Sequence, residues 1–430
     1  MTARSRSTRI LVVLALTNLV SYAARNALFT VYPVLRTRFH IDDAQIGLLQ
    51  TVFMLPHAAA TLPFGWAGDR WDRRRIIIAG VVAASLAGAA GALGHSYTGL
   101  AVSRAFVGLG TAVVVPVANS ILAQIFEGPH KASRLSVFNL GLFLGGVVGF
   151  AAGFLVGFPA VVIVLAVPGI VLAALIAGLP VPPRRGSAAA ADPEALAAAA
   201  PHEPVSEWRH IAEGLAQFLA EARILLGIRT LRWVMLSTTA MAFAAGGYNA
   251  WLKEFLTRDK HMTDAQAGTL LGLALVGGLA GILVGGWVAD RLRARRINGR
   301  LWTIVTGMTL TIPCAILAIE LPVGPALYAA GVATLFFISW YHAPMAASVD
   351  DLAPAGRSVA AQGLVIFTMH MLGTAPASWV VGEVSERAGL HFAMWVPTAL
   401  LAVAALAMAI ATTGFTADHA RARATRPANG

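Results

Sequence analysis

Two arginines lie among mostly apolar residues, where an unpaired charge is costly. Arg25 and Arg104 are both flanked by long apolar runs. A guanidinium presents a planar fork of hydrogen-bond donors that fits phosphate, sulfonate or carboxylate. The pair therefore indicates a site for an anion. The alternative is that each arginine is structural and bonds backbone carbonyls or the side chains of Asn18 and Asn119.

Several other polar side chains in apolar stretches are candidates for completing that site. The full set of substrate-binding candidates is Arg25, Arg104, Tyr22, Asn26, Asn119, Asn139, Tyr248, Asn249, His342 and His370. Histidine titrates near neutral pH, so His370 and His57 are also candidates for carrying a proton. For each histidine, a hydrogen bond between helices is the alternative role.

Acidic residues avoid the centres of the apolar stretches. Glu254, Glu320 and Glu383 come closest, at the ends of stretches, so the predicted site is electropositive. The single cysteine, Cys314, excludes a metal site built from several cysteines. The sequence shows no phosphate-binding P-loop, no Cys/His metal spacing and no Ser/His/Asp order with access to water. We therefore expect no enzyme activity, no metal and no cofactor.

The elements that hold these residues are predicted to be membrane helices. Of the 430 residues, 57% are hydrophobic and 12% are charged, whereas about 25% are charged in a typical soluble domain. A spanning helix needs about 20 mostly apolar residues. Twelve stretches qualify: 10–35, 45–66, 76–94, 98–126, 135–157, 159–180, 231–256, 265–288, 301–320, 324–349, 358–383 and 391–414.

The positive charges predict the orientation of these helices. With the N-terminus in the cytoplasm, lysine and arginine are about four times as frequent on the cytoplasmic side as on the other side. We therefore expect a multi-pass protein of the inner (plasma) membrane with both termini in the cytoplasm. This placement accounts for the net charge of +11 without nucleic acid as a partner. The expected partners are the lipid bilayer and an anionic substrate, and the expected state is a monomer.

A polar segment divides the stretches into two groups of six. Residues 181–230 begin with a Pro/Ala-rich run that is typical of a flexible linker. Apolar residues then recur at helical spacing from Trp208 to Leu225. This amphipathic helix lies either on the cytoplasmic membrane surface or under the helix bundle. The predicted domains are a bundle at 1–180, the linker at 181–230, a second bundle at 231–415 and a cytoplasmic tail at 416–430.

Two short strings repeat between the halves at the same offset. The string DAQIGLL at Asp43–Leu49 returns as DAQAGTL at Asp264–Leu270, and GWAGDR at Gly65–Arg70 returns as GWVADR at Gly286–Arg291. Both pairs are separated by 221 residues. The sequence therefore predicts two six-helix bundles that are related as parallel repeats.

This organisation resembles the major facilitator superfamily, through its Gly-x-x-x-Asp-Arg loops between the second and third helices of each half. In this chain Asp72 stands where the superfamily usually has Gly. The resemblance implies an all-α membrane protein of twelve helices. It also implies that the loops latch the cytoplasmic helix ends in one state and release them in the other. The candidate gating residues are Asp69, Arg70, Arg73, Asp290 and Arg291.

Two glycine patterns support the same resemblance. Residues 104–110 match the superfamily's Arg-x-x-x-Gly-x-Gly pattern, and glycines recur four residues apart at Gly141, Gly145, Gly149 and Gly153. Small residues at this spacing let two membrane helices approach closely. We expect a close helix contact along the stretch at 135–157.

A finer resemblance is to the Spinster branch, which exports lysolipids and sphingoid phosphates. The strings SYAARNALF, SRAFVGLGTA and RLSVFN carry it, together with residues 370–378. The family's carboxylates on helices 1, 4 and 11 are replaced here by Ala24, Thr111 and Thr374. This departure puts proton coupling through those carboxylates in doubt.

The expected function is secondary transport of an anionic amphiphile, such as a lysophospholipid or a sphingoid phosphate, by alternating access. One alternative is a transporter of a small organic anion or drug, working by uniport, by exchange or by histidine-linked proton coupling. Another is a receptor or scaffold on the same fold that transports nothing. Two intact Gly-x-x-x-Asp-Arg loops disfavour it, because a scaffold needs no gating latch.

Overall fold

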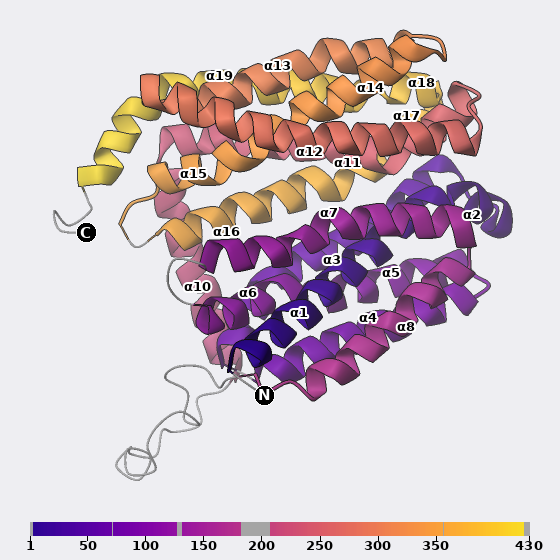
Figure 1. Cartoon of the computed structure of the whole chain (residues 1–430), viewed down its shortest axis with the longest axis horizontal. Helices are drawn as coiled ribbons and strands as arrows, with labels where there is room; N and C mark the ends of the chain where they lie inside the picture. Colours follow the sequence, from indigo (N-terminus) through magenta and orange to yellow (C-terminus); the bar gives the residue numbers. More distant parts are fainter. Residues whose placement is uncertain (1–2, 71, 127–130, 182–206, 356, 425–430) are drawn as a thin grey trace. The chain divides into compact units, whose positions relative to one another are not determined.

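The computed structural model describes residues 3–70, 72–126, 131–181, 207–355 and 357–424, and its regular structure within these ranges is helical (Figure 1). The first half contains α1 (Ala3–Asn26), the 3₁₀ helix η1 (Ala27–Thr30), α2 (Tyr32–Phe39), α3 (Asp43–Arg70), α4 (Arg73–Leu93), α5 (Tyr97–Thr111), α6 (Val114–Ile125), α7 (Lys131–Val156) and α8 (Ala160–Ala177).

The second half begins with the amphipathic helix α10. Its elements are α10 (Glu207–Leu226), α11 (Arg229–Glu254), the π-helix η3 (Phe255–Asp259), α12 (Asp264–Arg295), α13 (Gly299–Glu320), α14 (Pro325–Ile338), the 3₁₀ helix η4 (Ser339–Tyr341), α15 (His342–Leu352), α16 (Ser358–Thr368), the π-helix η5 (Met369–Thr374), α17 (Ala375–Ala388), α18 (Leu390–Ala393) and α19 (Trp395–Ala424).

Helices occupy all twelve predicted stretches, and the all-α class with twelve long helical segments is confirmed. Ten helical stretches of the described residues are long and apolar enough to cross a membrane. The other two predicted stretches correspond to α3 and α11. Helix α11 carries Arg232 near its start and both Lys253 and Glu254 at its end, so it is less apolar than its neighbours.

The chain divides into two compact units. Unit 1 comprises Met1–Asp42 and Val52–Gly214, and unit 2 comprises Asp43–Thr51 and Leu215–Gly430. Helix α3 therefore starts in unit 2 and continues in unit 1. The domain limits expected from the sequence stay a prediction.

Within unit 1, the glycine stripe of α7 packs directly on α1, which lies beside it in Figure 1. A Cβ atom added at Gly145 would overlap the carbonyl oxygen of Leu19, and one at Gly149 would overlap that of Ala23. Gly141 and Gly153 make the same kind of approach one turn to either side. The predicted close contact is present, because only glycine lets the two backbones approach this closely.

Within unit 2, the C-terminal part of α10 is built into the bundle core. Ala222 and Leu225 are buried in a cluster formed with α11, α13, α15, α16 and α19. Phe218 meets the ring of Phe367 edge-on, and Glu221 forms an ion pair with Arg357 at 2.8 Å. Of the two placements open from the sequence, packing against the helix bundle is the one observed.

Candidate functional site

Helix α5 carries Arg104 into the interior of unit 1, where the side chain is only 4% exposed. Its guanidinium carbon lies 4.5 Å from the ring centroid of Phe53, a distance that suits a cation–π contact. Within the described part of the chain, its Nε and Nη2 atoms have no hydrogen-bond partner. A buried guanidinium with two unused nitrogens is costly, so Arg104 is a charge whose hydrogen bonds the described residues leave incomplete.

Arg25 occupies the last turn of α1 and is partly buried. Its guanidinium carbon lies 5.9 Å from the ring centroid of Tyr22. The amide of Asn26 donates to the carbonyl oxygen of Tyr22 at 2.8 Å, so Asn26 bonds its own helix. Among the described residues, neither Arg25 nor Arg104 forms an ion pair with a carboxylate.

His57 on α3 lies against α5, the helix that carries Arg104. Its Nδ1 atom lies 3.1 Å from the carbonyl oxygen of Gly108 and 3.2 Å from the hydroxyl of Thr111. The charge of Arg25 acts electrostatically on both His57 and Arg104. A proton on Nδ1 lets the ring donate to the carbonyl, which orients His57 beside α5. We call Arg25, His57 and Arg104 the cationic cluster.

The other candidate residues of unit 1 are more dispersed. Asn119 on α6 is partly buried, and Asn139 on α7 is exposed. Asn18 donates to the carbonyl oxygen of Phe138 at 3.0 Å, which ties α1 to α7. Its amide is therefore used in helix packing.

Four predicted site residues belong to unit 2. The hydroxyl of Tyr248 lies 2.6 Å from that of Thr398, and Asn249 is exposed on α11. His342 is exposed, and its ring centroid lies 4.0 Å from that of Tyr341. His370 is partly buried in the π-helix η5. Substrate binding and proton transfer by these residues stay predictions.

The first Gly-x-x-x-Asp-Arg loop is described in part. Asp69 and Arg70 end helix α3, but their side chains lie outside the described residues. Arg73 is buried and donates to Gln124 at 2.7 Å and to Ser120 at 3.3 Å, so it ties α4 to α6. These contacts lie inside unit 1, and the gating role of Arg73 stays a prediction.

Asp72 has a local function that explains an acid at this position. Its carboxylate accepts hydrogen bonds from the backbone N–H groups of Arg74 at 3.0 Å and Arg75 at 3.4 Å. It thereby caps the first turn of α4. The aspartate that replaces the superfamily's usual glycine thus stabilises the start of α4.

The second loop has exposed acid and base side chains. Asp290 is exposed, and the guanidinium carbon of Arg291 lies 4.1 Å from the ring centroid of Trp287. Asp351 on α15 binds Arg300 at 2.7 Å and approaches Arg293 to 3.9 Å. Asp351 was not among the sequence candidates, because its partners come together only in the folded bundle.

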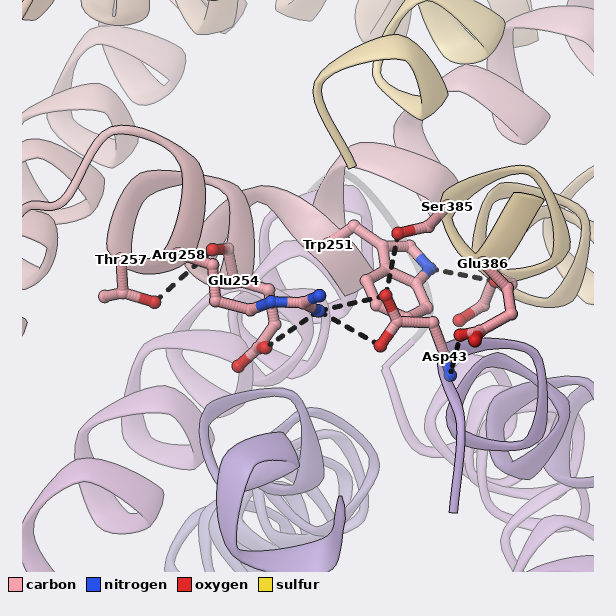
Figure 2. A network of polar contacts seen from close by, with 8 residues as sticks. Asp43, Trp251, Glu254, Thr257, Arg258, Ser385 and Glu386 are labelled. Carbon is pink, nitrogen blue, oxygen red and sulfur yellow. Dashed lines mark hydrogen bonds and ion pairs between the residues drawn. The ribbon is translucent and has the colours of Figure 1, made fainter. Parts of the chain in front are cut away.

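Sequence reasoning also missed a charged network in unit 2 (Figure 2). Asp43, in the first turn of α3, has both carboxylate oxygens about 3 Å from Nη1 of Arg258, at 3.0 and 2.9 Å. Ser385 donates to the same carboxylate at 2.7 Å. Glu254, which is 0% exposed, lies 3.7 Å from Arg258 on the next turn. We call these four residues the Asp43 network.

The Asp43 network fixes the start of α3 against α17. The backbone N–H of Asp43 donates to Glu386 at 3.3 Å, and Thr51 donates to the carbonyl oxygen of Ala375 at 2.7 Å. A Cβ atom added at Gly47 or Gly382 would overlap the facing helix. The repeated DAQ string was the available signal, but it did not reveal that Asp43 is buried.

Comparisons with known proteins find relatives of the same fold. The model of the Major Facilitator Superfamily matches residues 14–252 and 234–429. Protein spinster homolog 3 of Danio rerio is 28% identical over 408 residues, which cover 89% of this chain and 78% of that protein. The sphingosine-1-phosphate transporter SPNS2 of Danio rerio is 24% identical over 405 residues, which cover 87% of this chain and 75% of that protein.

Solved structures show the same architecture. A bacterial homolog of the human lysosomal transporter Spinster, inward-facing and unoccupied, gives a TM-score of 0.76 at 19% identity and covers 96% of this chain and 98% of that chain. The nucleoside transporter NupG gives a TM-score of 0.71 at 12% identity, and the match covers 96% of this chain and 99% of that chain. At these identities the likeness concerns the fold alone. Because the family model matches both halves of the sequence, the chain belongs to the Major Facilitator Superfamily and is a multi-pass membrane transporter, not an enzyme.

Proposed function

We propose that the chain transports an anionic amphiphile, of the lysophospholipid or sphingoid-phosphate type, across the inner (plasma) membrane by alternating access. The cationic cluster carries this proposal. Two arginines and a histidine lie close together in unit 1, and no carboxylate of the described residues pairs with either arginine. A ligand phosphate supplies the missing negative charge and accepts paired hydrogen bonds from a guanidinium.

We assign the head group to Arg25 in particular. It is only partly buried, whereas Arg104 is almost fully enclosed. The ring of Tyr22, one turn earlier on α1, lies 5.9 Å from the guanidinium carbon. The fork of N–H groups that Arg25 carries suits a phosphate monoester better than a neutral polar head group.

Similarity to a known transporter supports the assignment of a long apolar chain to the substrate. The related protein named above as a sphingosine-1-phosphate transporter handles a ligand with a phosphate head and one long chain. The charged head and apolar chain of such a ligand match an arginine site in an otherwise apolar environment. The same proposal places both termini in the cytoplasm. It assigns the gate to Asp69, Arg70, Arg73, Asp290 and Arg291.

A thermal-shift screen on the purified protein tests the assignment. The ligands are a lysophospholipid, a sphingoid phosphate, an uncharged single-chain lipid of equal length and a short-chain phosphate. We expect the two charged lipids to raise the melting temperature more than either partial ligand. Stabilisation by the uncharged lipid alone would contradict the anion site, and stabilisation by the short phosphate alone would favour a small organic anion as substrate.

A further inference from the structure

A histidine just before the last long helix of unit 2 bridges two carboxylates from other segments. His391 lies on the short helix α18. Its Nδ1 atom is 3.0 Å from a carboxylate oxygen of Asp259, the last residue of η3, and its Nε2 atom is 3.1 Å from one of Glu320, the last residue of α13. One ring therefore joins three segments that are far apart in the sequence. We call these three residues the histidine bridge.

The chemistry of imidazole makes this bridge depend on a proton. An ionised carboxylate only accepts hydrogen bonds, and a neutral imidazole has a single N–H group. A neutral ring therefore satisfies one carboxylate and turns the lone pair of its other nitrogen toward the second. Only the doubly protonated imidazolium donates to both. The observed geometry, with a carboxylate oxygen at each ring nitrogen, is thus that of a protonated His391.

The charges that act on the ring come from the two bridge carboxylates. A negative charge at this distance favours the charged form of a histidine. The next residue after η3, Lys260, donates its ammonium group to the carbonyl oxygen of Leu321 at 3.0 Å. It is therefore engaged at a backbone group beside Glu320.

The charged side chains of the helices next to α18 have partners of their own. On α17, Arg387 is bonded to Glu383, and Glu386 accepts a hydrogen bond from the backbone of Asp43. The first turn of α19 carries no charged residue. The protonation of His391 is therefore governed by Asp259 and Glu320.

Solvent protons reach the histidine bridge. The side chain of His391 is 43% exposed and that of Glu320 is 50% exposed. Helix α19 runs from Trp395 to Ala424, so the bridge lies at the membrane face opposite the C-terminal end of that helix. The ring therefore responds to the pH on that side of the membrane.

The π-helix η3 links the histidine bridge to the Asp43 network. Arg258 and Asp259 are successive residues of η3, and Arg258 binds Asp43 at the start of α3 (Figure 2). Phe255, the first residue of η3, is 1% exposed, and its ring centroid lies 6.0 Å from that of His391. A π-helix is rare and has no long run of its own hydrogen bonds, so η3 depends on such contacts. Loss of the bridge should loosen η3 and weaken the bond of Arg258 to α3.

We propose that the histidine bridge is a pH-sensitive clamp on the start of α3. When His391 is protonated, the bridge fixes η3 and thereby holds Asp43–Thr51 within unit 2. When the ring is neutral, one carboxylate is released and this packing weakens. The clamp is complete at low pH and opens as the ring loses its proton at higher pH, which for an unperturbed histidine occurs at about pH 6.5. This regulation does not depend on which substrate the protein transports.

Hydrogen–deuterium exchange of the purified full-length protein tests the clamp. Exchange in η3 and in Asp43–Thr51 is measured at about pH 5.5 and about pH 8.5, on either side of the usual histidine range. Each variant is compared with the wild type at the same pH, so the intrinsic pH dependence of exchange cancels. We expect His391→Gln to speed exchange in both segments at least about threefold at the low pH and by less at the high pH. His95→Gln, at an exposed histidine of unit 1, should change neither segment.

Glu320→Gln separates the proton from the shape of the bridge. An amide N–H can donate to an unprotonated Nε2 while Nδ1–H donates to Asp259, so a neutral ring completes this bridge. The variant should match the wild type at the low pH and exchange more slowly than the wild type at the high pH. Equal effects of His391→Gln at both pH values, or wild-type pH dependence in Glu320→Gln, would overturn the proposal. A change confined to η3 would also overturn it, because the clamp would then not reach α3.

Discussion

The two units hold buried charge in opposite ways. In the Asp43 network of unit 2, Arg258 contacts two carboxylates, and Asp43 also accepts a bond from Ser385. In the cationic cluster of unit 1, Arg25 and Arg104 have no carboxylate partner among the described residues, and Arg104 keeps two unused nitrogens. In one region the protein itself pairs the arginine with carboxylates, whereas in the other no carboxylate of the described residues does so.

From this contrast we infer which buried charges are structural and which are functional. A satisfied buried network fixes the geometry of the helices that contribute to it. An unsatisfied buried charge costs stability unless a ligand completes it, and such sites are typical of function in membrane proteins. We therefore expect substitutions in unit 1 to change transport and substitutions in the Asp43 network to change stability.

The largest expected effect is on transport by Arg25→Ala. Removing the guanidinium deletes the head-group contact, so transport of a single-chain lipid phosphate should fall at least about a hundredfold, which corresponds to two paired charge-assisted hydrogen bonds. Arg25→Lys should restore little, because lysine lacks the planar fork. Proteoliposome uptake measures both variants, with equal protein incorporation as the control. Wild-type uptake by Arg25→Ala would show that the arginine is structural.

The next effect concerns the Asp43 network. Asp43→Asn keeps the shape of the side chain but leaves Arg258 without its closest negative partner. We expect the free energy of unfolding to fall by about 2 kcal/mol, less than for a fully enclosed ion pair because Arg258 is partly exposed. Thermal unfolding in detergent measures the loss. Unchanged stability would mean that the network does not hold α3 to α17.

The sequence repeat provides a matched control for Asp43. Asp264 occupies the equivalent position in the second copy of the string, and it forms an ion pair with Lys253 at 3.0 Å while being 69% exposed. Lys253 is only 5% exposed, but the Asp264 carboxylate stays in contact with solvent, whereas that of Asp43 is 4% exposed and also accepts a bond from Ser385. We therefore expect Asp264→Asn to cost less than Asp43→Asn. Equal losses would refute the distinction between the buried and the exposed copy.

Asp43 and Asp264 illustrate which features the sequence alone predicts and which it does not. Hydropathy located the twelve helical segments, because membrane helices must be long and apolar. The glycines of α7 were correctly predicted to make a close contact, because their four-residue spacing defines one helix face. The repeat identified Asp43 and Asp264 as equivalent, yet burial depends on tertiary neighbours such as Ser385 and Gly382, which are distant in sequence.

The candidate site was predictable only in its chemistry. Charge among apolar residues identified Arg25 and Arg104, and the structure places His57 against the helix that carries Arg104. The cavity that Arg104 lines was not predictable, since residues of four separate helices form it. Asp351 and Glu254 were missed as structural charges, because their arginine partners are recognised only when the helices are packed.

A smaller effect is expected at the start of α4. Asp72→Ala removes the carboxylate that caps the backbone N–H groups of Arg74 and Arg75. Loss of such a cap costs about 1 kcal/mol, and transport should stay near the wild-type rate. Thermal unfolding together with uptake separates the two effects. A loss of transport at unchanged stability would instead assign Asp72 to the gate.

The central claim is that the cationic cluster binds a phosphate through Arg25. The most direct measurement is a thermodynamic cycle of equilibrium binding, in which wild type and Arg25→Ala each bind a single-chain lipid phosphate and its uncharged analogue of equal length. We predict that the variant loses at least about tenfold more affinity for the phosphate than for the uncharged lipid, a coupling of about 1.4 kcal/mol or more. Equal losses for the two ligands would contradict the account.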